Sequence, residues 1–217
     1  MYLSSEPSVT EYINSFYKPL DDFLGSLRED GEKRNVPIIL KETETYLNTL
    51  LTILKPKKIL EIGTAIGYSA IYFAKKCPDA EIYSIEKFAE VSNEAKRNVE
   101  EAGLSKRIHL LTGDGEESVL ELEKEGIIDF DFVFIDAAKS QYQRFFESVT
   151  RVSKENAVIL ADNIWQHGFT FIKDENPPRK HRTNIRKMRS FVESMENSKE
   201  FTTSLINVGD GLLLATK

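Results

Sequence analysis

Two apolar stretches of the sequence end in side chains of the kind that bind metal ions. FVFIDAAK delivers Asp136 and Lys139 after a run fit for a buried strand, and AVILADN delivers Asp162 and Asn163 after another. If the two runs are parallel neighbours, these side chains meet at one edge of a sheet. Two carboxylates about 4 Å apart repel by roughly 4 kcal/mol at an effective dielectric near 20. A dication reverses that repulsion, and two carboxylates with an amide oxygen suit Mg²⁺.

Lys139 is the predicted catalytic base. It stands one helical turn after Asp136, within reach of a hydroxyl group held by such a metal ion. Metal coordination lowers the pKa of an enol or a phenol, and a neighbouring amine can then take the proton. Taken singly, each residue has an ordinary alternative: a solvated lysine, an aspartate that caps a helix, an Asp-Asn turn. Their convergence on one crevice favours the metal site. Zinc is not predicted, because the histidines lack ligand spacing.

A glycine loop upstream predicts a second ligand. LEIGTAIGYS ends another apolar run, and Gly63 and Gly67 allow a tight turn close to a ligand. The spacing lacks the middle glycine of the dinucleotide signature, which disfavours pyrophosphate and therefore a nicotinamide oxidoreductase. Glu61 suits an ammonium group, while Ser69 and the start of a helix suit a carboxylate. An amino acid moiety carries both groups.

The next two strand ends extend this predicted pocket. Glu86 ends EIYSIE, where a carboxylate can accept the hydroxyl groups of a ribose, and Asp114 in TGDG suits an exocyclic amine such as that of adenine. Amino acid, ribose and adenine together make S-adenosylmethionine, the predicted cofactor. Glu86 alone could equally be a surface acid, but matching positions at three successive strand ends favour the cofactor.

The elements that position these residues alternate between strand and helix. Strand-length apolar runs lie at 58–62, 81–85, 107–111, 131–135 and 157–161, and helical spacing begins at Ser69, Ala89, Glu116 and Gln141. Continuous apolar strands separated by helices are typical of a parallel sheet covered on both faces. After a helix from about Lys180 to Met195, FTTSLIN and GLLLATK are joined by VGDG, which predicts a closing antiparallel hairpin. The expected fold is a Rossmann-like α/β sandwich with a mostly parallel seven-stranded sheet.

Length and composition predict one domain over residues 1–217, with residues 1–55 as an N-terminal helical appendage. Pro19 separates two short helices there, and an amphipathic stretch runs from Thr43 to Leu54. The 41% hydrophobic content supplies a substantial core.

A net charge of -6 argues against general attraction to nucleic acid or anionic lipid. With one cysteine and no run of membrane-spanning length, we expect a cytoplasmic protein without membrane contact.

Taken together, these motifs resemble the metal-dependent O-methyltransferases of the catechol and caffeoyl-CoA type, over nearly the whole chain. The resemblance lies in LEIGTAIGYS, IEK, GDG, FIDAAK, ADN and VGDGL. It implies a class I methyltransferase fold, a homodimer, and Mg²⁺ held by Asp136, Asp162 and Asn163. It also implies cofactor contacts by a set of residues from several loops: Ile39, Ser69, Glu86, Asp114, Gly115 and Asp136. Within the family, the closest likeness is to the bacterial tRNA 5-hydroxyuridine methyltransferases.

The substrate prediction depends on a basic segment in an otherwise acidic chain. Six basic residues without an acid stand just beyond the predicted metal loop: Arg179, Lys180, Arg182, Arg186, Lys187 and Arg189. They are predicted to hold phosphates of a tRNA anticodon loop, with the wobble uridine as methyl acceptor. Trp165, Phe169 and Phe171 would stack on the base, unless they belong to the core.

Three alternatives to this substrate prediction stay open. The basic segment could be a solvated helix face. It could also hold the phosphates of a conjugated phenol, because the same chemistry serves catechol-like or caffeoyl-CoA-like substrates. An RNA-binding module without catalysis is a further possibility, opposed by the full set of metal and cofactor positions.

Overall fold

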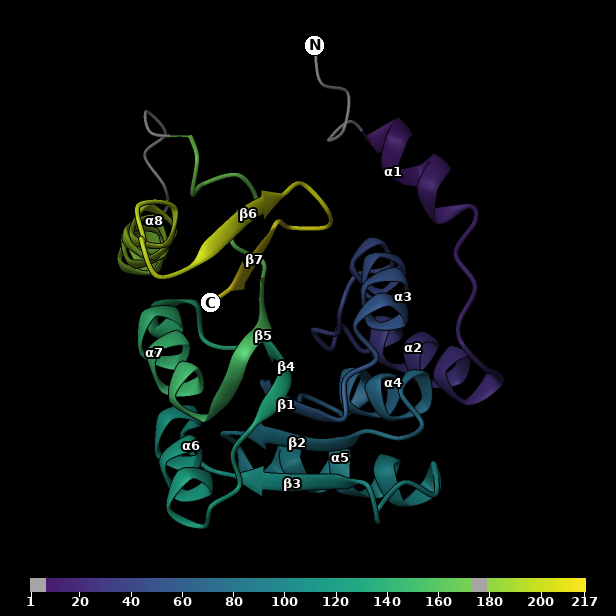
Figure 1. Cartoon of the computed structure of the whole chain (residues 1–217). Coiled ribbons are helices and arrows are strands. Elements are labelled where there is room, and N and C mark those ends of the chain that lie inside the picture. Colours follow the sequence, from purple (N-terminus) through teal and green to yellow (C-terminus); the bar gives the residue numbers. More distant parts are fainter. Residues whose placement is uncertain (1–6, 173–178) are drawn as a thin grey trace.

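The computed structural model describes residues 7–172 and 179–217, which form a seven-stranded sheet between two layers of helices (Figure 1). The strands are β1 (Lys58–Ile62), β2 (Glu81–Glu86), β3 (Ile108–Thr112), β4 (Phe130–Ile135), β5 (Ser153–Asp162), β6 (Thr202–Ile206) and β7 (Leu212–Thr216). Their spatial order is β3-β2-β1-β4-β5-β7-β6. The first five strands are parallel, and β7 pairs antiparallel with both β5 and β6. The predicted fold class and the closing hairpin are thereby confirmed.

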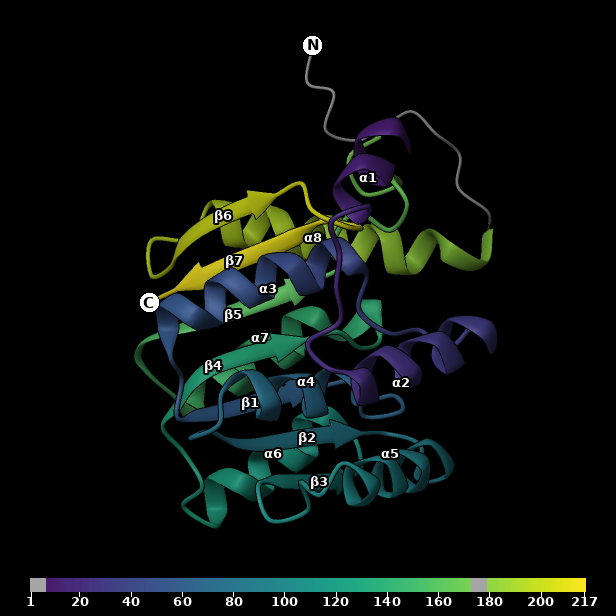
Figure 2. The same cartoon turned by 90° about the vertical axis from the view of Figure 1, so that its right-hand side faces the viewer.

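Helices cover both faces of the sheet. They are α1 (Pro7–Asn14), α2 (Asp22–Lys33), α3 (Lys41–Leu54), α4 (Tyr68–Lys76), α5 (Ala89–Glu101), α6 (Gly115–Lys124), α7 (Tyr142–Val152) and α8 (Arg182–Glu196). Figure 2 shows α2 to α5 in front of the sheet and α6 to α8 behind it. Each layer buries its own apolar cluster against the sheet, which explains the continuous apolar strands.

The strand register brings the predicted site residues to one level. Ile62 of β1 lies beside Ile135 of β4, and Ile135 lies beside Ala161 of β5. The residues that follow, Gly63, Asp136 and Asp162, therefore lie at the same level. Gly63 and Asp136 stand just beyond their strands, and Asp162 is the last residue of β5. Because strand order reverses between β1 and β4, this edge is also the position where doubly wound sheets bind ligands.

One strand boundary differs clearly from the prediction. β5 begins at Ser153, directly after α7, whereas the apolar run predicted a start at Ala157. The early part pairs irregularly, since the register shifts between Phe130 and Phe132 of β4. Its polar residues are exposed at Lys154 and Glu155, so it carries no hydrophobic signal.

The predicted N-terminal appendage contributes to the main core. Pro19 lies between α1 and α2, as expected. Leu24 of α2 and Leu47 and Leu51 of α3 are buried in the same apolar cluster as β1 and α4. The second and third helices are thus packed on the sheet layer that carries the glycine loop.

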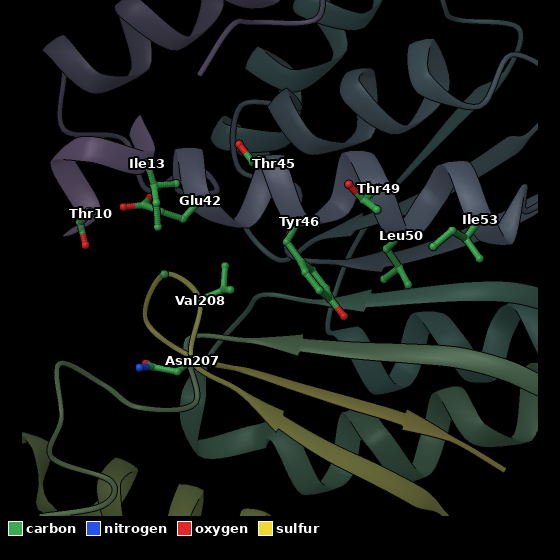
Figure 3. Close-up of a pocket in the computed structure, with 11 residues that line it drawn as sticks. Thr10, Ile13, Glu42, Thr45, Tyr46, Thr49, Leu50, Ile53, Asn207 and Val208 are labelled. Carbon is green, nitrogen blue, oxygen red and sulfur yellow. The ribbon is translucent and has the colours of Figure 1, made fainter. Parts of the chain in front are cut away.

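A further feature of the structure lies along α3. A cavity of about 530 Å³ lies between α1, α3 and the turn from β6 to β7, with Tyr46, Leu50 and Val208 in its wall (Figure 3). None of the predicted site residues lines it.

Over residues 7–172 and 179–217, we find no helix with the length and apolar character needed to cross a membrane.

Candidate active site

The exits of β1 and β4 are in direct backbone contact. The amide N–H of Asp136 donates to the carbonyl oxygen of Ile62 at 2.9 Å. Gly63 has a φ of +107°, and a Cβ atom there would lie 1.9 Å from the carbonyl oxygen of Asp136. Only glycine permits this approach, so the predicted cofactor loop and the predicted metal loop form one continuous wall.

Four predicted residues gather beside this contact. The Nζ of Lys139 donates to Oδ1 of Asp136 at 2.9 Å and to Oδ1 of Asn163 at 2.7 Å. Oδ1 of Asp162 accepts the amide N–H of Asn163 at 2.6 Å. Oδ2 of Asp162 is buried without a hydrogen-bond partner among the described residues. The structure therefore brings together the predicted metal ligands and the predicted base.

This group fits a hard dication. Asp162 is fully buried, and a buried carboxylate oxygen without a partner is costly unless something compensates it. Burial and then the charge of Asp136 raise the pKa of Asp162. Oxygen donors from Asp136, Asp162 and Asn163 would hold Mg²⁺, which prefers such ligands. No trio of His, Cys, Asp or Glu side chains suited to a metal occurs in the described part of the chain, so the fit depends on the amide of Asn163.

Lys139 is held by a residue that the sequence reasoning missed. The hydroxyl group of Tyr142 accepts from Lys139 Nζ at 2.9 Å and donates to the carbonyl oxygen of Asp162 at 2.8 Å. Burial alone would lower the pKa of Lys139, but Tyr142 and Asp136 outweigh it and raise the pKa. The spacing in the sequence could have predicted this contact. Tyr142 stands three residues after Lys139, and residues three apart lie on the same side of a helix.

Glu61 lies inside the glycine-loop wall. It is fully buried and accepts a hydrogen bond from Ser84 Oγ, while its Oε1 has no partner among the described residues. Burial raises the pKa of Glu61 to about 7, against the opposing effect of the nearby Ser69 and Ser84 hydroxyl groups. The unpaired oxygen suits the predicted ammonium group. Ser84 was not predicted, although its place two residues before Glu86 puts it on the same strand face.

The remaining predicted cofactor residues lie around the same edge. Glu86 accepts from the amide N–H groups of Ala65 at 3.1 Å and Phe88 at 3.0 Å, so it ties the glycine loop to the end of β2. Asp114 caps α6 by accepting from the amide of Glu116 at 3.2 Å. The structure thus gives both acids a role within the protein, alongside the predicted ligand contacts.

Gly115 and Ile39 are buried next to this edge. A Cβ atom at Gly115 would lie 2.8 Å from the ring of Phe145, so glycine is needed for α6 to pack on α7. Ile39 is 3% exposed, and its carbonyl oxygen accepts a hydrogen bond from Arg28 at 3.0 Å.

The basic segment divides into two parts. The side chains of Arg179, Arg182, Arg186 and Lys187 are exposed, and that of Lys180 lies outside the described part of the chain. Arg189 is half-buried and donates to the carbonyl oxygens of Phe169, Thr170 and Ile172, at 2.6 to 2.7 Å. Arg189 therefore binds carbonyl groups of the protein and not the predicted phosphates. These hydrogen bonds hold the loop that follows Asn163.

The aromatic residues of that loop have different surroundings. Trp165 packs edge-on against Phe171 with ring centroids 5.6 Å apart, and Phe171 is 59% exposed. The amide of Trp165 donates to the carbonyl oxygen of Asp210, and a Cβ atom at Gly211 would lie 2.2 Å from its ring. The turn between β6 and β7 thus packs against the ring of Trp165 and accepts a hydrogen bond from its backbone. Neither ring belongs to the fully buried core.

The fold and the arrangement of the site define a class I methyltransferase, and comparison with known proteins agrees. The chain belongs to the O-methyltransferase family, whose model, described as "O-methyltransferase", matches residues 14–217. The predicted membership of the O-methyltransferase family is thereby confirmed.

Individual relatives cover nearly the whole chain. A catechol O-methyltransferase of Niastella koreensis is 29% identical over 96% of both chains. The crystal structure of a putative caffeoyl-CoA O-methyltransferase from Staphylococcus aureus superposes with a TM-score of 0.88 at 30% identity, over 95% of this chain and 98% of the other. An O-methyltransferase from Bacillus cereus, solved in complex with SAH, gives 0.82 at 26% identity over 96% of both chains. The likeness to tRNA-modifying members stays a prediction.

Proposed function

We propose that the protein transfers a methyl group from S-adenosylmethionine to the 5-hydroxyl group of 5-hydroxyuridine at the tRNA wobble position, giving 5-methoxyuridine. The general activity, O-methyl transfer from S-adenosylmethionine, is supported by the family and by relatives solved with the cofactor or its product, from Streptomyces achromogenes and Bacillus cereus. One observation supports the metal-dependent chemistry: Asp162 carries a buried, unpaired Oδ2 and is close enough to Asp136 for its pKa to be raised by that charge, while Lys139 joins Asp136 to Asn163.

The chain's own residues would divide the reaction as follows. Asp136, Asp162 and Asn163 would hold Mg²⁺, and the bound ion would supply Lewis acidity that lowers the pKa of the acceptor hydroxyl group. Lys139 would take the hydroxyl proton at Nζ as a neutral amine, and Tyr142 would keep that amine in place. The charge of Asp136 is one of the causes that raise the pKa of Lys139, and a cation held by Asp136 would offset it and favour the neutral form. The acceptor oxygen forms a bond to the methyl carbon as the sulfur–carbon bond breaks, and S-adenosylhomocysteine leaves. Glu61 orients the donor through its ammonium group.

The tRNA substrate is supported by the surface beside the site. Exposed basic side chains on α8 lie beyond the loop that carries Trp165 and Phe171. Phosphate contacts position a nucleic acid, and exposed aromatic rings stack on bases that leave the helix. A catechol-like or caffeoyl-CoA-like phenol is the second candidate, favoured by the names of the relatives.

The decisive experiment is methyl transfer from labelled S-adenosylmethionine. The acceptors are a tRNA that carries 5-hydroxyuridine, the same tRNA with unmodified uridine, a panel of catechols, and caffeoyl-CoA. Each is tested with Mg²⁺ and with a chelator. We expect label only in the hydroxyuridine tRNA and only with metal. Label in the phenols alone would replace the tRNA by the second candidate, and tRNA binding without any transfer would indicate a binding module.

The homodimer implied by the family resemblance and the cytoplasmic location expected from the composition stay predictions. Light scattering on the purified protein measures the mass directly, and a mass near 24.8 kDa would contradict the dimer.

A further inference from the structure

A buried ion pair lies outside the residues that the proposed chemistry uses. Arg28 of α2 is 4% exposed and Glu44 of α3 is 3% exposed, with 2.6 Å between Nη2 and Oε2. Burying two charges is expensive, and a pair of this kind seldom adds net stability compared with apolar residues of the same size. Such a pair is better explained by the geometry that it imposes on its neighbours.

The guanidinium group of Arg28 connects four separate segments. Its Nε donates to the hydroxyl groups of Tyr17 at 2.9 Å and Tyr68 at 3.2 Å. Its Nη2 donates to the carbonyl oxygen of Ile39 at 3.0 Å in addition to Glu44. The hydroxyl group of Tyr68 in turn donates to Glu44 at 2.6 Å. The planar fork of arginine makes such a multiple contact possible, and the point charge of lysine does not.

Two of these partners belong to the walls of the candidate cofactor site. Tyr68 is the first residue of α4, between Gly67 of the glycine loop and Ser69. Ile39 is itself a predicted cofactor residue, and its carbonyl group is fixed by Arg28. Tyr17 belongs to the same cluster, since its hydroxyl group donates to Glu44 at 3.0 Å and lies 3.3 Å from that of Tyr68. The remaining partner, Glu32, lies within α2 itself, and its side chain is 45% exposed.

The body of α2 presses on the same two walls. A Cβ atom at Gly31 would lie 3.3 Å from Ile66 in the glycine loop and 3.4 Å from Ile38. Gly31 stands one turn after Arg28 on α2. The two residues therefore contact adjacent positions: Gly31 packs against Ile38 and Ile66, and Arg28 binds Ile39 and Tyr68.

We propose that Arg28 is a positioning residue for the methyl donor. It fixes the segment before α3 and the start of α4 relative to each other before the donor binds, and Glu44 holds the guanidinium group in that position. A site ordered in advance loses less conformational freedom on binding. The inference rests on the proposed function, because it takes the donor to bind between these walls.

The test compares two variants that each remove one partner of Arg28. Tyr68→Phe removes the contact to the wall, and Glu32→Gln removes the charge of a partner that lies on α2 itself. We expect Tyr68→Phe and Arg28→Lys to raise the dissociation constant for S-adenosylhomocysteine, measured by calorimetry, by about tenfold. Glu32→Gln should stay within about twofold of the wild type, because a half-exposed ion pair within one helix contributes little. The KM for the acceptor should change little in all of them.

Two further measurements separate positioning from general stability. Binding is measured at a temperature where thermal unfolding shows each variant to be folded. Hydrogen exchange should become faster at residues 38–40 and 66–69 of Tyr68→Phe, and stay unchanged in β4 and β5. Wild-type affinity in folded Tyr68→Phe and Arg28→Lys would overturn the inference. Failure of the wild type to bind S-adenosylhomocysteine would instead refute the proposed function.

Discussion

The two halves of the candidate site are built differently. The donor half, at the ends of β1 to β3, is made from backbone contacts and buried side chains such as Glu61, which is fully buried. The acceptor half, beyond β5, consists of a loop held by Arg189 and of exposed side chains on α8. Asp136 and Asp162 stand between them. The donor half is therefore suited to one fixed ligand, while the acceptor half can differ among relatives without disturbing the core.

The largest effect should come from the boundary between the two halves. Asp162→Ala removes the buried oxygen that suits the metal ion, so we expect methyl transfer to fall by about a thousandfold or more, because metal stabilisation supplies several kcal/mol. Affinity for S-adenosylhomocysteine should fall by less than about threefold, since the donor half is left intact.

Metal binding is read directly by calorimetric titration with Mn²⁺ or Mg²⁺. Asp210→Ala is the matched control, because that acid lies near Asp162 but outside the predicted ligand set. If Asp162→Ala bound metal as the wild type does, the assignment of the site would be wrong.

Substitution of Lys139 tests whether the residues between the donor and acceptor halves also include the catalytic base. Lys139→Met keeps the length of the side chain and removes the amine, and we expect kcat to fall by about 10² to 10⁴, the usual contribution of a positioned base. Tyr142→Phe should cost less, because the amine retains Asp136 and Asn163 as partners. Both are measured as single-turnover rates at saturating donor. Equal losses in the two variants would indicate that the amine serves only to organise the loop.

Sequence reasoning recovered the strands and most strand ends of this structure. Continuous apolar runs are the signature of strands buried on both faces, and the acids that follow them are placed by the register. The start of β5 was missed because Lys154 and Glu155 are exposed and carry no apolar signal. An apolar pattern reveals only the buried part of a strand. Residues 154 and 155 pair in the sheet but are exposed, so the pattern does not include them.

The partners of single side chains were harder to predict. Arg186 and Arg189 look alike in the sequence, yet one is exposed and the other is held by loop carbonyl groups. Helical phase held part of the answer, since Arg189 borders the buried stripe of Ile185, Met188 and Val192. The ion pair between Arg28 and Glu44 had no such signal, because a contact between α2 and α3 depends on tertiary packing.

Glu61 gives the donor half a distinct pH dependence. Burial raises its pKa to about 7, and an ammonium group needs the ionised carboxylate. Affinity for S-adenosylhomocysteine should therefore be about tenfold weaker at pH 6 than at pH 8. The free protein should respond in the opposite sense. A carboxyl group with a raised pKa in the folded state stabilises the fold below its usual pKa, and that contribution is lost as the pH rises through 7.

The control ligand for this measurement is 5′-methylthioadenosine, which lacks the amino acid moiety and should bind with little change between pH 6 and pH 8. The control variant is Glu61→Gln, which should remove both pH effects. A pH-independent affinity for S-adenosylhomocysteine in the wild type would show that Glu61 does not face the ammonium group.

The smallest effects are expected in the acceptor half, where they separate the two kinds of arginine. A tRNA loop held by all six basic residues predicts a slope near -4 for log affinity against log salt, and contacts by these residues without Arg189 predict a slope of about -3.5. Arg186→Ala should reduce the magnitude of the slope by about 0.7 and weaken binding a few-fold. Arg189→Lys should leave the slope unchanged and raise the KM for the acceptor, because its partners are carbonyl groups of the protein. A wild-type affinity that does not respond to salt would remove the nucleic acid from the acceptor half and leave the small phenol as its substrate.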